Sequence, residues 1–307
     1  MRIAIVGAGA MGSLFGSMLS MVSDVYLIDP YEDHVNAINE KGLIVEQEDK
    51  TSAKFRIFAA SDPFQVKQGI DLAIIFTKSY MTAQAAKTAL PLLSEKGLIL
   101  TLQNGLGNME LIADIAGKQR TIAGVTSHGG TLAGPGHVRH AGKGPTYIAP
   151  ASSNTPSINH IKDIFQAAGI ETIISQNLDT LIWGKLIINA GINALAAIIR
   201  VPNGTLLTPE SEKIMEQAVN EAVNIANALN IELPYDKPFE QVKEVCKKTF
   251  ANKASMLQDI LRGARTEIDV INQAIVKKGR ELGIDTPCNA FLSDIIKALE
   301  ATWENRI

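Results

Sequence analysis

Apolar residues recur in short blocks through the first half of the chain, separated by stretches with helical periodicity. The first block, Ile3–Val6, has the length of a buried strand, and a glycine turn and a helical stretch to about Met21 follow it. Further strands are expected at Val25–Ile28, Leu72–Phe76 and Leu98–Leu102, and further helices at Tyr31–Lys41 and Met81–Leu93. Strands that alternate with helices predict a parallel sheet covered on both faces.

Two other stretches of the first half have the alternation of β-strands. Residues Asp49–Ala60 predict a pair of strands inserted into the α/β scheme. The glycine-rich stretch Gly129–Gly144 predicts an antiparallel edge or excursion.

Strand signals fade near residue 175, and helical periodicity dominates the remainder of the chain. Prolines fall at the breaks between the expected helices, where a residue without a backbone N–H is tolerated. The expected helices are Asn177–Arg200, Pro209–Leu229, Phe239–Thr249, Arg265–Leu282 and Pro287–Trp303. At 307 residues the chain is long enough for two domains, so we predict an α/β domain followed by an all-helical one.

A glycine motif follows the first strand directly: Gly7-Ala8-Gly9-Ala10-Met11-Gly12 has the spacing G-x-G-x-x-G. The first glycine permits a tight turn, the second lets the backbone approach a pyrophosphate, and the third lets helix and strand pack closely. The N-terminus of the next helix would face the phosphates with its N–H groups. We therefore expect cofactor contacts at Gly7, Gly9, Ala10, Met11 and Gly12. The alternative is a glycine turn in an unrelated α/β protein.

The glycine motif indicates the type of the first expected domain. Residues 1–175 are expected to form a Rossmann-type dinucleotide-binding domain, and residues 176–307 a helical domain with substrate and catalytic residues.

Asp29 closes the second strand, 20 residues beyond Gly9. A carboxylate at this place accepts hydrogen bonds from the ribose hydroxyls of NAD and repels the 2′-phosphate of NADP. An NADP site would require a nearby cation, but Lys41 is the first lysine or arginine after Asp29. The sequence therefore favours NAD(H) and leaves NADP(H) open. In the alternative interpretation, Asp29 only caps the helix that begins near Tyr31.

Lys185, Asn189 and Asn193 recur every four residues in the apolar stretch Leu181–Ile199, so they form one polar stripe on a helix. Reduction of a carbonyl by hydride requires a proton donor to the developing alkoxide, and a lysine supplies both charge and proton. The alternative is a buried network that ties two helices together. The stretch is long enough to span a membrane, but three polar groups are costly in lipid, so we expect a core helix and no membrane partner.

Composition excludes several other classes of protein. A net charge of −3, the lack of a basic block and 5% aromatic residues argue against a nucleic-acid partner. Cys246 and Cys288 are the only cysteines, which suits a reducing compartment, so we expect a cytoplasmic protein. His137 and His140 fall on an expected strand, and no metal site is predicted.

Ser255 and Glu267 belong to a second polar group, twelve residues apart near the C-terminus. A hydroxyl can donate to a substrate carboxylate, whereas a carboxylate needs a donor from its ligand. Their spacing alone does not identify a site, and a surface capping cluster is the alternative.

With these motifs in place, the chain resembles the ketopantoate reductases (2-dehydropantoate 2-reductases) over nearly its whole length. A Lys-x-x-x-Asn element alone is shared with hydroxyisobutyrate-type dehydrogenases. The pair Ser255 and Glu267 and the stretch Gln103-Asn104-Gly105-Leu106-Gly107 narrow the resemblance. The other matching stretches include Thr77-Lys78-Ser79, Gly134-Pro135-Gly136-His137, Trp183-Gly184-Lys185 and Pro202-Asn203-Gly204.

The resemblance implies reduction of 2-dehydropantoate to D-pantoate by a nicotinamide cofactor, a step of pantothenate and coenzyme A biosynthesis. It implies that Lys185 is the general acid and that Glu267 binds the terminal hydroxyl of the substrate. The further implied roles are substrate contacts at Asn189, Asn193, Asn203 and Ser255, a cofactor contact at Lys78, and a place for Asn104 near the nicotinamide ribose and the reacting carbonyl. The family also implies a homodimer that binds a small-molecule 2-keto acid between its domains.

Asp29 departs from the family pattern, because the NADPH-using members place an arginine near this strand end. NAD-using relatives include D-2-hydroxyacid (mandelate-type) dehydrogenases, and this activity is the alternative function. A noncatalytic NAD(H)-binding regulator is a third interpretation. Such a regulator would keep the glycine turn but would not need Lys185, Asn189, Ser255 and Glu267 together.

Overall fold

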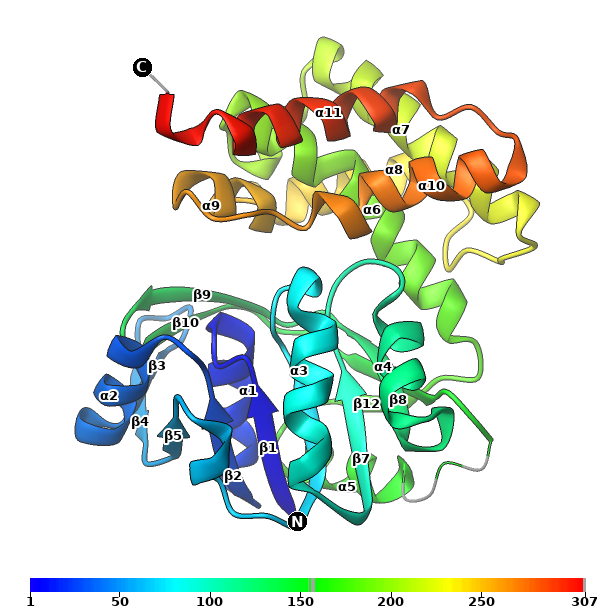
Figure 1. Ribbon diagram of the computed structural model, residues 1–307. Coiled ribbons are helices and arrows are strands. Elements are labelled where there is room, and N and C mark those ends of the chain that lie inside the picture. The colour runs from blue at the N-terminus through cyan, green and yellow to red at the C-terminus, as the bar shows by residue number, and fades with distance from the viewer. Residues whose placement is uncertain (154, 156–157, 306–307) are drawn as a thin grey trace. The chain divides into compact units, whose positions relative to one another are not determined.

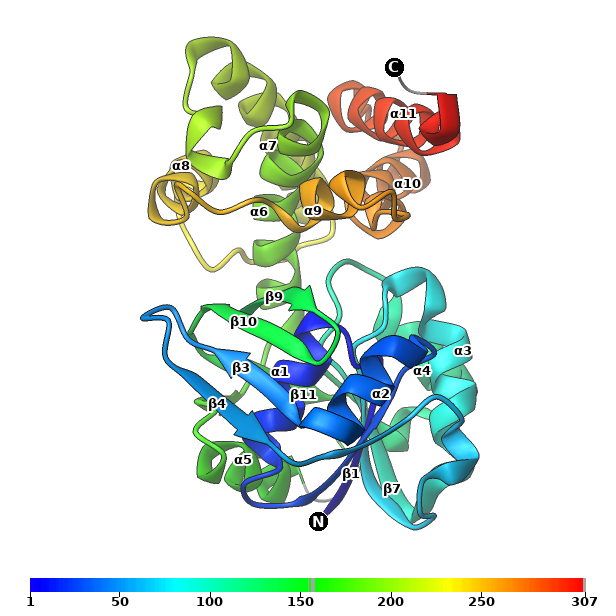
Figure 2. The ribbon, with the colours of Figure 1, turned by 90° about the vertical axis from the view of Figure 1, so that its left-hand side faces the viewer.

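The computed structural model describes residues 1–153, 155 and 158–305 and divides into two compact units. The first unit comprises Met1–Gln103 and Gly107–Leu178, and the second comprises Asn104–Leu106 and Asp179–Ile307. Figures 1 and 2 show the first as a layered α/β structure and the second as a bundle of helices. The fold class is therefore the predicted one, a Rossmann-type α/β unit followed by a helical unit.

The first unit is built on an eight-stranded sheet in the order β12-β11-β8-β7-β6-β1-β2-β5. Its neighbouring strands are parallel except for β8 and β11. The strands are β1 (Arg2–Val6), β2 (Asp24–Ile28), β5 (Phe58–Ala60), β6 (Ile70–Ile75), β7 (Leu93–Thr101), β8 (Thr121–Thr126), β11 (Thr146–Pro150) and β12 (Thr172–Ile174).

Helices cover both faces of this sheet, which explains why its central strands read as continuous apolar runs. In β1, Ile3 and Ile5 join one core and Ala4 and Val6 join another, because successive side chains point to opposite faces. The first core includes residues of α1 (Ala10–Leu19), α2 (Glu32–Lys41) and α5 (Ile158–Ala167), and the second includes residues of α3 (Thr82–Ala89) and α4 (Asn108–Ala116).

A second, four-stranded sheet has the order β4-β3-β10-β9. It contains β3 (Leu43–Glu46), β4 (Ser52–Phe55), β9 (Gly129–Gly134) and β10 (His137–Gly142). Strands β9 and β10 are antiparallel, which confirms the antiparallel excursion expected at Gly129–Gly144. The strand pair expected within Asp49–Ala60 is wrong, since β4 pairs with β3 while β5 pairs with β2 of the large sheet. Alternation identifies a strand but does not identify its partner.

The second unit contains α6 (Leu178–Ile199), α7 (Pro209–Ala228), α8 (Pro238–Lys248), α9 (Ser255–Leu261), α10 (Asn272–Leu282), α11 (Pro287–Ala301) and the short turns η5 (Asn203–Leu206) and η6 (Ile268–Val270). The single helix expected over Arg265–Leu282 is wrong, because α10 begins only at Asn272. The fully buried amide of Asn272 donates to Ala190 O and to Asn289 Oδ1, both at 3.0 Å. These tertiary contacts fix the start of α10, and the short 3-10 turn η6 precedes it.

Helix α6 forms the centre of the second unit. It is long and apolar enough to cross a membrane, but 67% of its most hydrophobic window is buried inside the fold. Gly191 brings it close to α7 and α8, since an added Cβ would lie 3.0 Å from Val219 and 3.2 Å from Val242. Packing between helices therefore accounts for its hydrophobicity.

The three glycines of the turn between β1 and α1 differ in whether the fold has room for a side chain at their positions. Gly7 has a φ of +95°, and an added Cβ would lie 2.5 Å from the backbone nitrogen of Thr77. A Cβ on Gly12 would lie 1.9 Å from Gly7 O. A Cβ on Gly9, by contrast, would have no atom of the described residues within 4 Å. The fold therefore requires glycine at positions 7 and 12 but not at position 9.

We expect Gly12→Ala to lower the free energy of unfolding by about 1–3 kcal/mol, because α1 must move away from the backbone of Gly7 to admit the methyl group. Gly9→Ala should cost only roughly 0.5 kcal/mol, since Ala is a somewhat poorer N-cap than Gly. Urea denaturation of the two variants measures this difference. Equal destabilisation by both would contradict the packing argument.

Candidate active site

The N-terminus of α1 has the properties of a phosphate-binding turn. Gly9 is the N-cap of the helix, no side chain caps it, and no acidic residue lies in the first turn. The space beside Gly9 is open, whereas Gly7 and Gly12 are closely packed. The backbone N–H groups at Ala10 and Met11 begin the helix, whose dipole favours an anion here. The residues present therefore fit the pyrophosphate of a dinucleotide.

Asp29 lies at the carboxyl end of β2, next to β1 in the sheet. Its Oδ1 accepts a hydrogen bond from the backbone N–H of Tyr31 at 3.0 Å. Helix α2 begins at Glu32 with Tyr31 as its N-cap, so Asp29 shapes the turn before the helix and is not the cap residue itself. Glu32 and Asp33 add two further acidic side chains in the first turn of α2.

Lys78 follows β6, the other neighbour of β1, and is half-buried as the N-cap of a short turn at Ser79–Met81. A polar network that the sequence did not reveal holds this segment. Gln103 donates to Thr77 O at 2.8 Å, and Thr82 donates to Asn108 Oδ1 at 2.8 Å. The structure thus brings Lys78 beside the glycine turn, whose Gly7 packs against Thr77.

Lys185 lies on α6 and is half-buried. Burial lowers the pKa of its ammonium from 10.5 to about 8, and the negative charge of Glu267 opposes this shift. The preceding turn is anchored by Tyr235, whose hydroxyl donates to Gly184 O at 2.8 Å. Gly184 packs against Pro234 so closely that an added Cβ would lie 2.6 Å from its ring. No spacing in the sequence connects these residues with α6.

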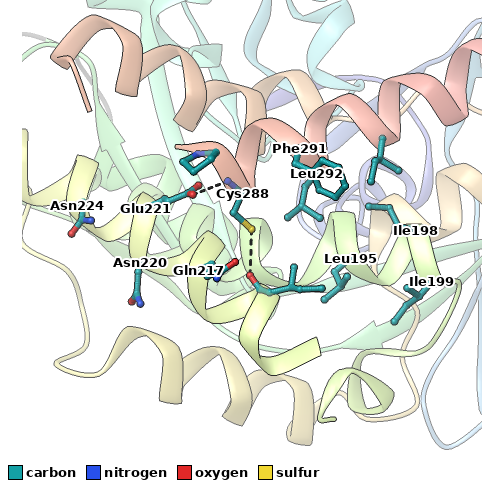
Figure 3. A pocket seen from close by; sticks show the side chains of 13 residues that line it. Leu195, Ile198, Ile199, Gln217, Asn220, Glu221, Asn224, Cys288, Phe291 and Leu292 are labelled. Carbon is teal, nitrogen blue, oxygen red and sulfur yellow. Dashed lines mark hydrogen bonds between the residues drawn. The ribbon is translucent and has the colours of Figure 1, made fainter. Parts of the chain in front are cut away.

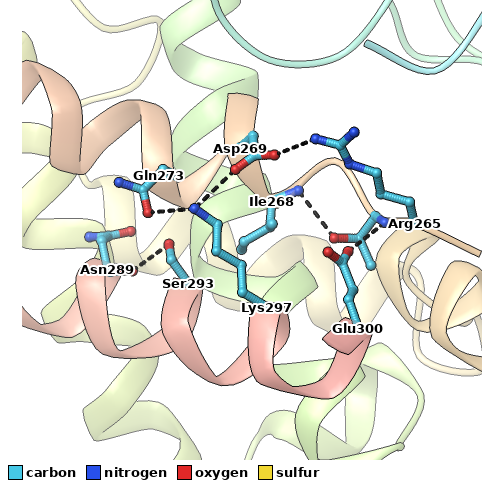
Figure 4. Close-up of polar contacts among 9 residues, drawn as sticks. Arg265, Ile268, Asp269, Gln273, Asn289, Ser293, Lys297 and Glu300 are labelled. Atoms are coloured by element: carbon cyan, nitrogen blue, oxygen red, sulfur yellow. Dashed lines mark hydrogen bonds and ion pairs between the residues drawn. The ribbon is translucent and has the colours of Figure 1, made fainter. Parts of the chain in front are cut away.

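Glu267 is buried, with 8% of its surface exposed, just before η6. Polar contacts on both sides fix this segment (Figure 4). Asp269 accepts from Arg265 and from Lys297 of α11, both at 3.0 Å. The backbone N–H of Thr266 donates to Glu300 of α11 at 2.7 Å. These contacts hold Glu267 in the unit that carries Lys185.

The loop that carries Asn104 is attached to the same segment. The N–H of Leu106 donates to Val270 O at 3.0 Å. Gly105 has a φ of +87°, and an added Cβ would lie 2.5 Å from Val270 O. Asn104 therefore lies two residues before Leu106 in a loop that is bonded to Val270, in the segment that follows Glu267.

The remaining residues of the expected site lie on three elements of the second unit. Asn189 is half-buried and Asn193 is buried on successive turns of α6. Asn193 Nδ2 lies 3.5 Å from the hydroxyl of Ser255, an exposed residue at the start of α9. Asn203, in contrast, donates to Thr249 Oγ1 at 2.9 Å, a contact that joins η5 to the end of α8. The structure brings Asn193 and Ser255 together and gives Asn203 a structural contact.

Two family models and a curated relative match this chain over most of its length. The family model described as "Ketopantoate reductase PanE/ApbA" matches residues 3–153, and its C-terminal counterpart matches residues 177–300. The 2-dehydropantoate 2-reductase of Halobacterium salinarum is 35% identical over 97% of this chain and 98% of its own.

Two solved structures are similar over the whole chain. A PanE/ApbA family ketopantoate reductase from Ralstonia eutropha JMP134 is 35% identical, with a TM-score of 0.91 and coverage of 99% of this chain and 100% of its own. A D-mandelate dehydrogenase with NADH and anilino(oxo)acetate is 30% identical, with a TM-score of 0.92 and the same coverage. Since the two family models together match most of the sequence, the chain belongs to the ketopantoate reductase PanE/ApbA family.

Proposed function

We propose that this protein reduces 2-dehydropantoate to D-pantoate with NADH, and that Lys185 is the general acid. The observation that carries the proposal is the half-buried ammonium of Lys185, with its pKa lowered to about 8 and with the charge of Glu267 acting on it. The relatives named 2-dehydropantoate 2-reductase, at 35% identity over nearly the whole chain, support the same substrate.

The bound nicotinamide would supply the hydride. Lys185 is mostly protonated at pH 7, so its Nζ can donate a proton to the carbonyl oxygen as negative charge develops there. Its positive charge also stabilises that oxygen. A pKa near 8 suits a general acid better than the ordinary value of 10.5, because the proton is released more readily. The negative charge of Glu267 opposes the loss of this proton.

Glu267 offers a physical basis for substrate choice. We propose that its carboxylate accepts a hydrogen bond from the terminal hydroxyl of 2-dehydropantoate, while Asn189, Asn193 and Ser255 contact the remainder of the acid. A substrate without this hydroxyl would leave a buried carboxylate unpaired. Sites that bind a hydroxyl by hydrogen bonds reject analogues that lack it by large factors. The resemblance also implies a substrate contact at Asn203. Asn203 would have to make this contact while its amide nitrogen donates to Thr249 Oγ1.

The acidic turn after β2 favours NADH over NADPH. Asp29, Glu32 and Asp33 would repel a 2′-phosphate, and the basic residue of α2, Lys41, lies in its last turn. The expected cofactor contacts at Gly7, Gly9, Ala10, Met11, Gly12, Lys78 and Asn104 remain part of this proposal.

A D-2-hydroxyacid dehydrogenase is the second candidate function. The structure of D-mandelate dehydrogenase that is 30% identical to this chain was obtained with NADH, the cofactor that Asp29 favours here. The two candidates differ in the terminal hydroxyl of the substrate and therefore in the role of Glu267.

We further propose that the protein is a cytoplasmic homodimer. A groove of about 690 Å³ lies on the second unit between α6, α7 and α11 (Figure 3). Apolar side chains line most of it, including Phe291, which is 66% exposed, and Ile199, which is 43% exposed. Exposed apolar surface of this kind is typical of contacts between proteins.

The pH dependence of the reduction tests the role of Lys185. Because the ammonium is the active form, kcat/KM for the keto acid should be constant below pH 8 and fall tenfold per pH unit above it. Glu267→Gln removes the charge that raises the pKa, so the fall should begin at lower pH. Lys185→Ala should lose about 10²–10⁴-fold in kcat and show no midpoint. A wild-type midpoint that persists in Lys185→Ala would assign the acid to another group.

Substrate and cofactor preference test the proposed activity. We expect NADH to be used better than NADPH, and 2-dehydropantoate to be reduced at least about tenfold faster, by kcat/KM, than phenylglyoxylate or 3-methyl-2-oxobutanoate. In Glu267→Ala the advantage of 2-dehydropantoate should shrink. If phenylglyoxylate is preferred tenfold by the wild type, the mandelate-type function replaces the one proposed.

Light scattering on a sizing column tests the oligomeric state. We expect the mass of a dimer for the wild-type chain and the mass of a monomer for Phe291→Asp, because a buried charge at the groove costs several kcal/mol. The exposed Phe64 of the first unit provides a control, and Phe64→Asp should stay dimeric. A monomeric wild-type protein would refute the proposal.

A further inference from the structure

His34 is a buried residue of α2 that none of the assignments above uses. Only 1% of its surface is exposed, and both ring nitrogens have partners. The backbone N–H of Gly136, in the turn between β9 and β10, donates to Nδ1 at 2.9 Å. The other nitrogen, Nε2, lies 3.0 Å from the hydroxyl of Ser13 on α1. Ser13 in turn donates to Ala8 O at 2.6 Å.

The donors and acceptors in this chain of contacts have one consistent direction. A backbone N–H can only donate, so Nδ1 of His34 must be an unprotonated acceptor. A neutral ring then carries its proton on Nε2 and donates it to Ser13. Because Ser13 uses its own proton for Ala8 O, its oxygen is available as the acceptor. Burial lowers the pKa of His34, although the nearby negative charge of Asp29 acts to raise it. The lowered pKa favours the neutral form of the ring.

The chain of contacts ends inside the glycine turn. Ala8 stands between Gly7 and Gly9, and the peptide bond that joins Ala8 to Gly9 is planar and trans. A hydrogen bond that fixes Ala8 O therefore also fixes the N–H of Gly9 on the opposite side of the peptide. Gly9 is the position of the turn beside which an added Cβ would meet no atom within 4 Å.

His34 is also linked to the acidic side of the expected cofactor site. The ring of Tyr31 stacks on His34 at 6° with 6.2 Å between centroids, and the backbone N–H of Tyr31 donates to Asp29. One buried ring thus connects the glycine turn, the turn after β2 and the β9–β10 hairpin.

We propose that His34 is a positioning residue for cofactor binding: acting through Ser13, it holds the Ala8–Gly9 peptide in the orientation that receives the pyrophosphate. The proposal rests on the proposed use of a dinucleotide by this site. It assigns His34 to the affinity for NADH and not to the transfer of hydride or proton.

Two conservative variants separate the two hydrogen bonds of the ring. The side-chain oxygen of His34→Asn can replace Nδ1 and accept from Gly136, but it leaves Ser13 without its donor. The amide nitrogen of His34→Gln can replace Nε2 and donate to Ser13, but it leaves Gly136 without its acceptor. The proposal predicts that only the loss of the Ser13 contact weakens cofactor binding strongly.

Fluorescence titration with NADH gives the dissociation constant of each variant. We expect His34→Asn and Ser13→Ala each to weaken NADH binding about tenfold, the size expected when one buried hydrogen bond is lost. The double variant should be no weaker than either single one, and His34→Gln should stay within about threefold of the wild type. The KM for NADH should rise in parallel, while kcat at saturating NADH should be unchanged.

Asn39→Ala is the matched control. Asn39 lies on the same helix and exchanges two hydrogen bonds with the backbone of Ala59 in β5, away from the glycine turn. It should lower the melting temperature and leave the affinity for NADH at the wild-type value. Wild-type affinity in His34→Asn or Ser13→Ala, or equal weakening in His34→Asn, His34→Gln and Asn39→Ala, would overturn the proposal.

The titration also separates this inference from the proposed function. A wild-type chain that binds NADH but reduces neither 2-dehydropantoate nor phenylglyoxylate would refute the proposed activity and leave the prediction for His34 intact. A wild-type chain that binds neither NADH nor NADPH would refute both.

Discussion

The chemistry proposed for this protein depends on the partial removal of the Lys185 ammonium from water. An exposed lysine holds its proton too firmly to be an efficient acid at neutral pH, and a deeply buried one would be neutral and have no proton to give. The pKa of Lys185 lies between these limits. Burial lowers the pKa to about 8, and the charge of Glu267 prevents a further fall. The carboxylate of Glu267 thus stabilises the protonated form of Lys185, and in our proposal it also recognises the substrate.

The remainder of the second unit supports this pair of residues. Gly184 allows Pro234 and Tyr235 to approach the turn of α6 that precedes Lys185, and the hydroxyl of Tyr235 holds that turn. On the other side, Asp269 and its two cationic partners hold the segment of Glu267 against α11. Side-chain contacts therefore hold the backbone next to each of the two charged residues.

Local sequence was sufficient for the features that depend on spacing. The glycine turn, the parallel strands around β1 and the polar stripe on α6 follow from motif and periodicity, and the structure has all three elements. Features that depend on distant partners could not be predicted. The separation of β4 from β5, the break before α10 at Asn272, and the bond between His34 and Gly136, 102 residues apart, are of this kind.

The charge state of Lys185 is the most direct test of this account. Lysine labelled at its side-chain nitrogen, with the signal of Lys185 assigned by its loss in Lys185→Arg, can be titrated by NMR without substrate. We expect a midpoint at about pH 8 in the wild-type protein and a lower one in Glu267→Gln. A midpoint near the ordinary value of 10.5, unchanged in Glu267→Gln, would contradict it.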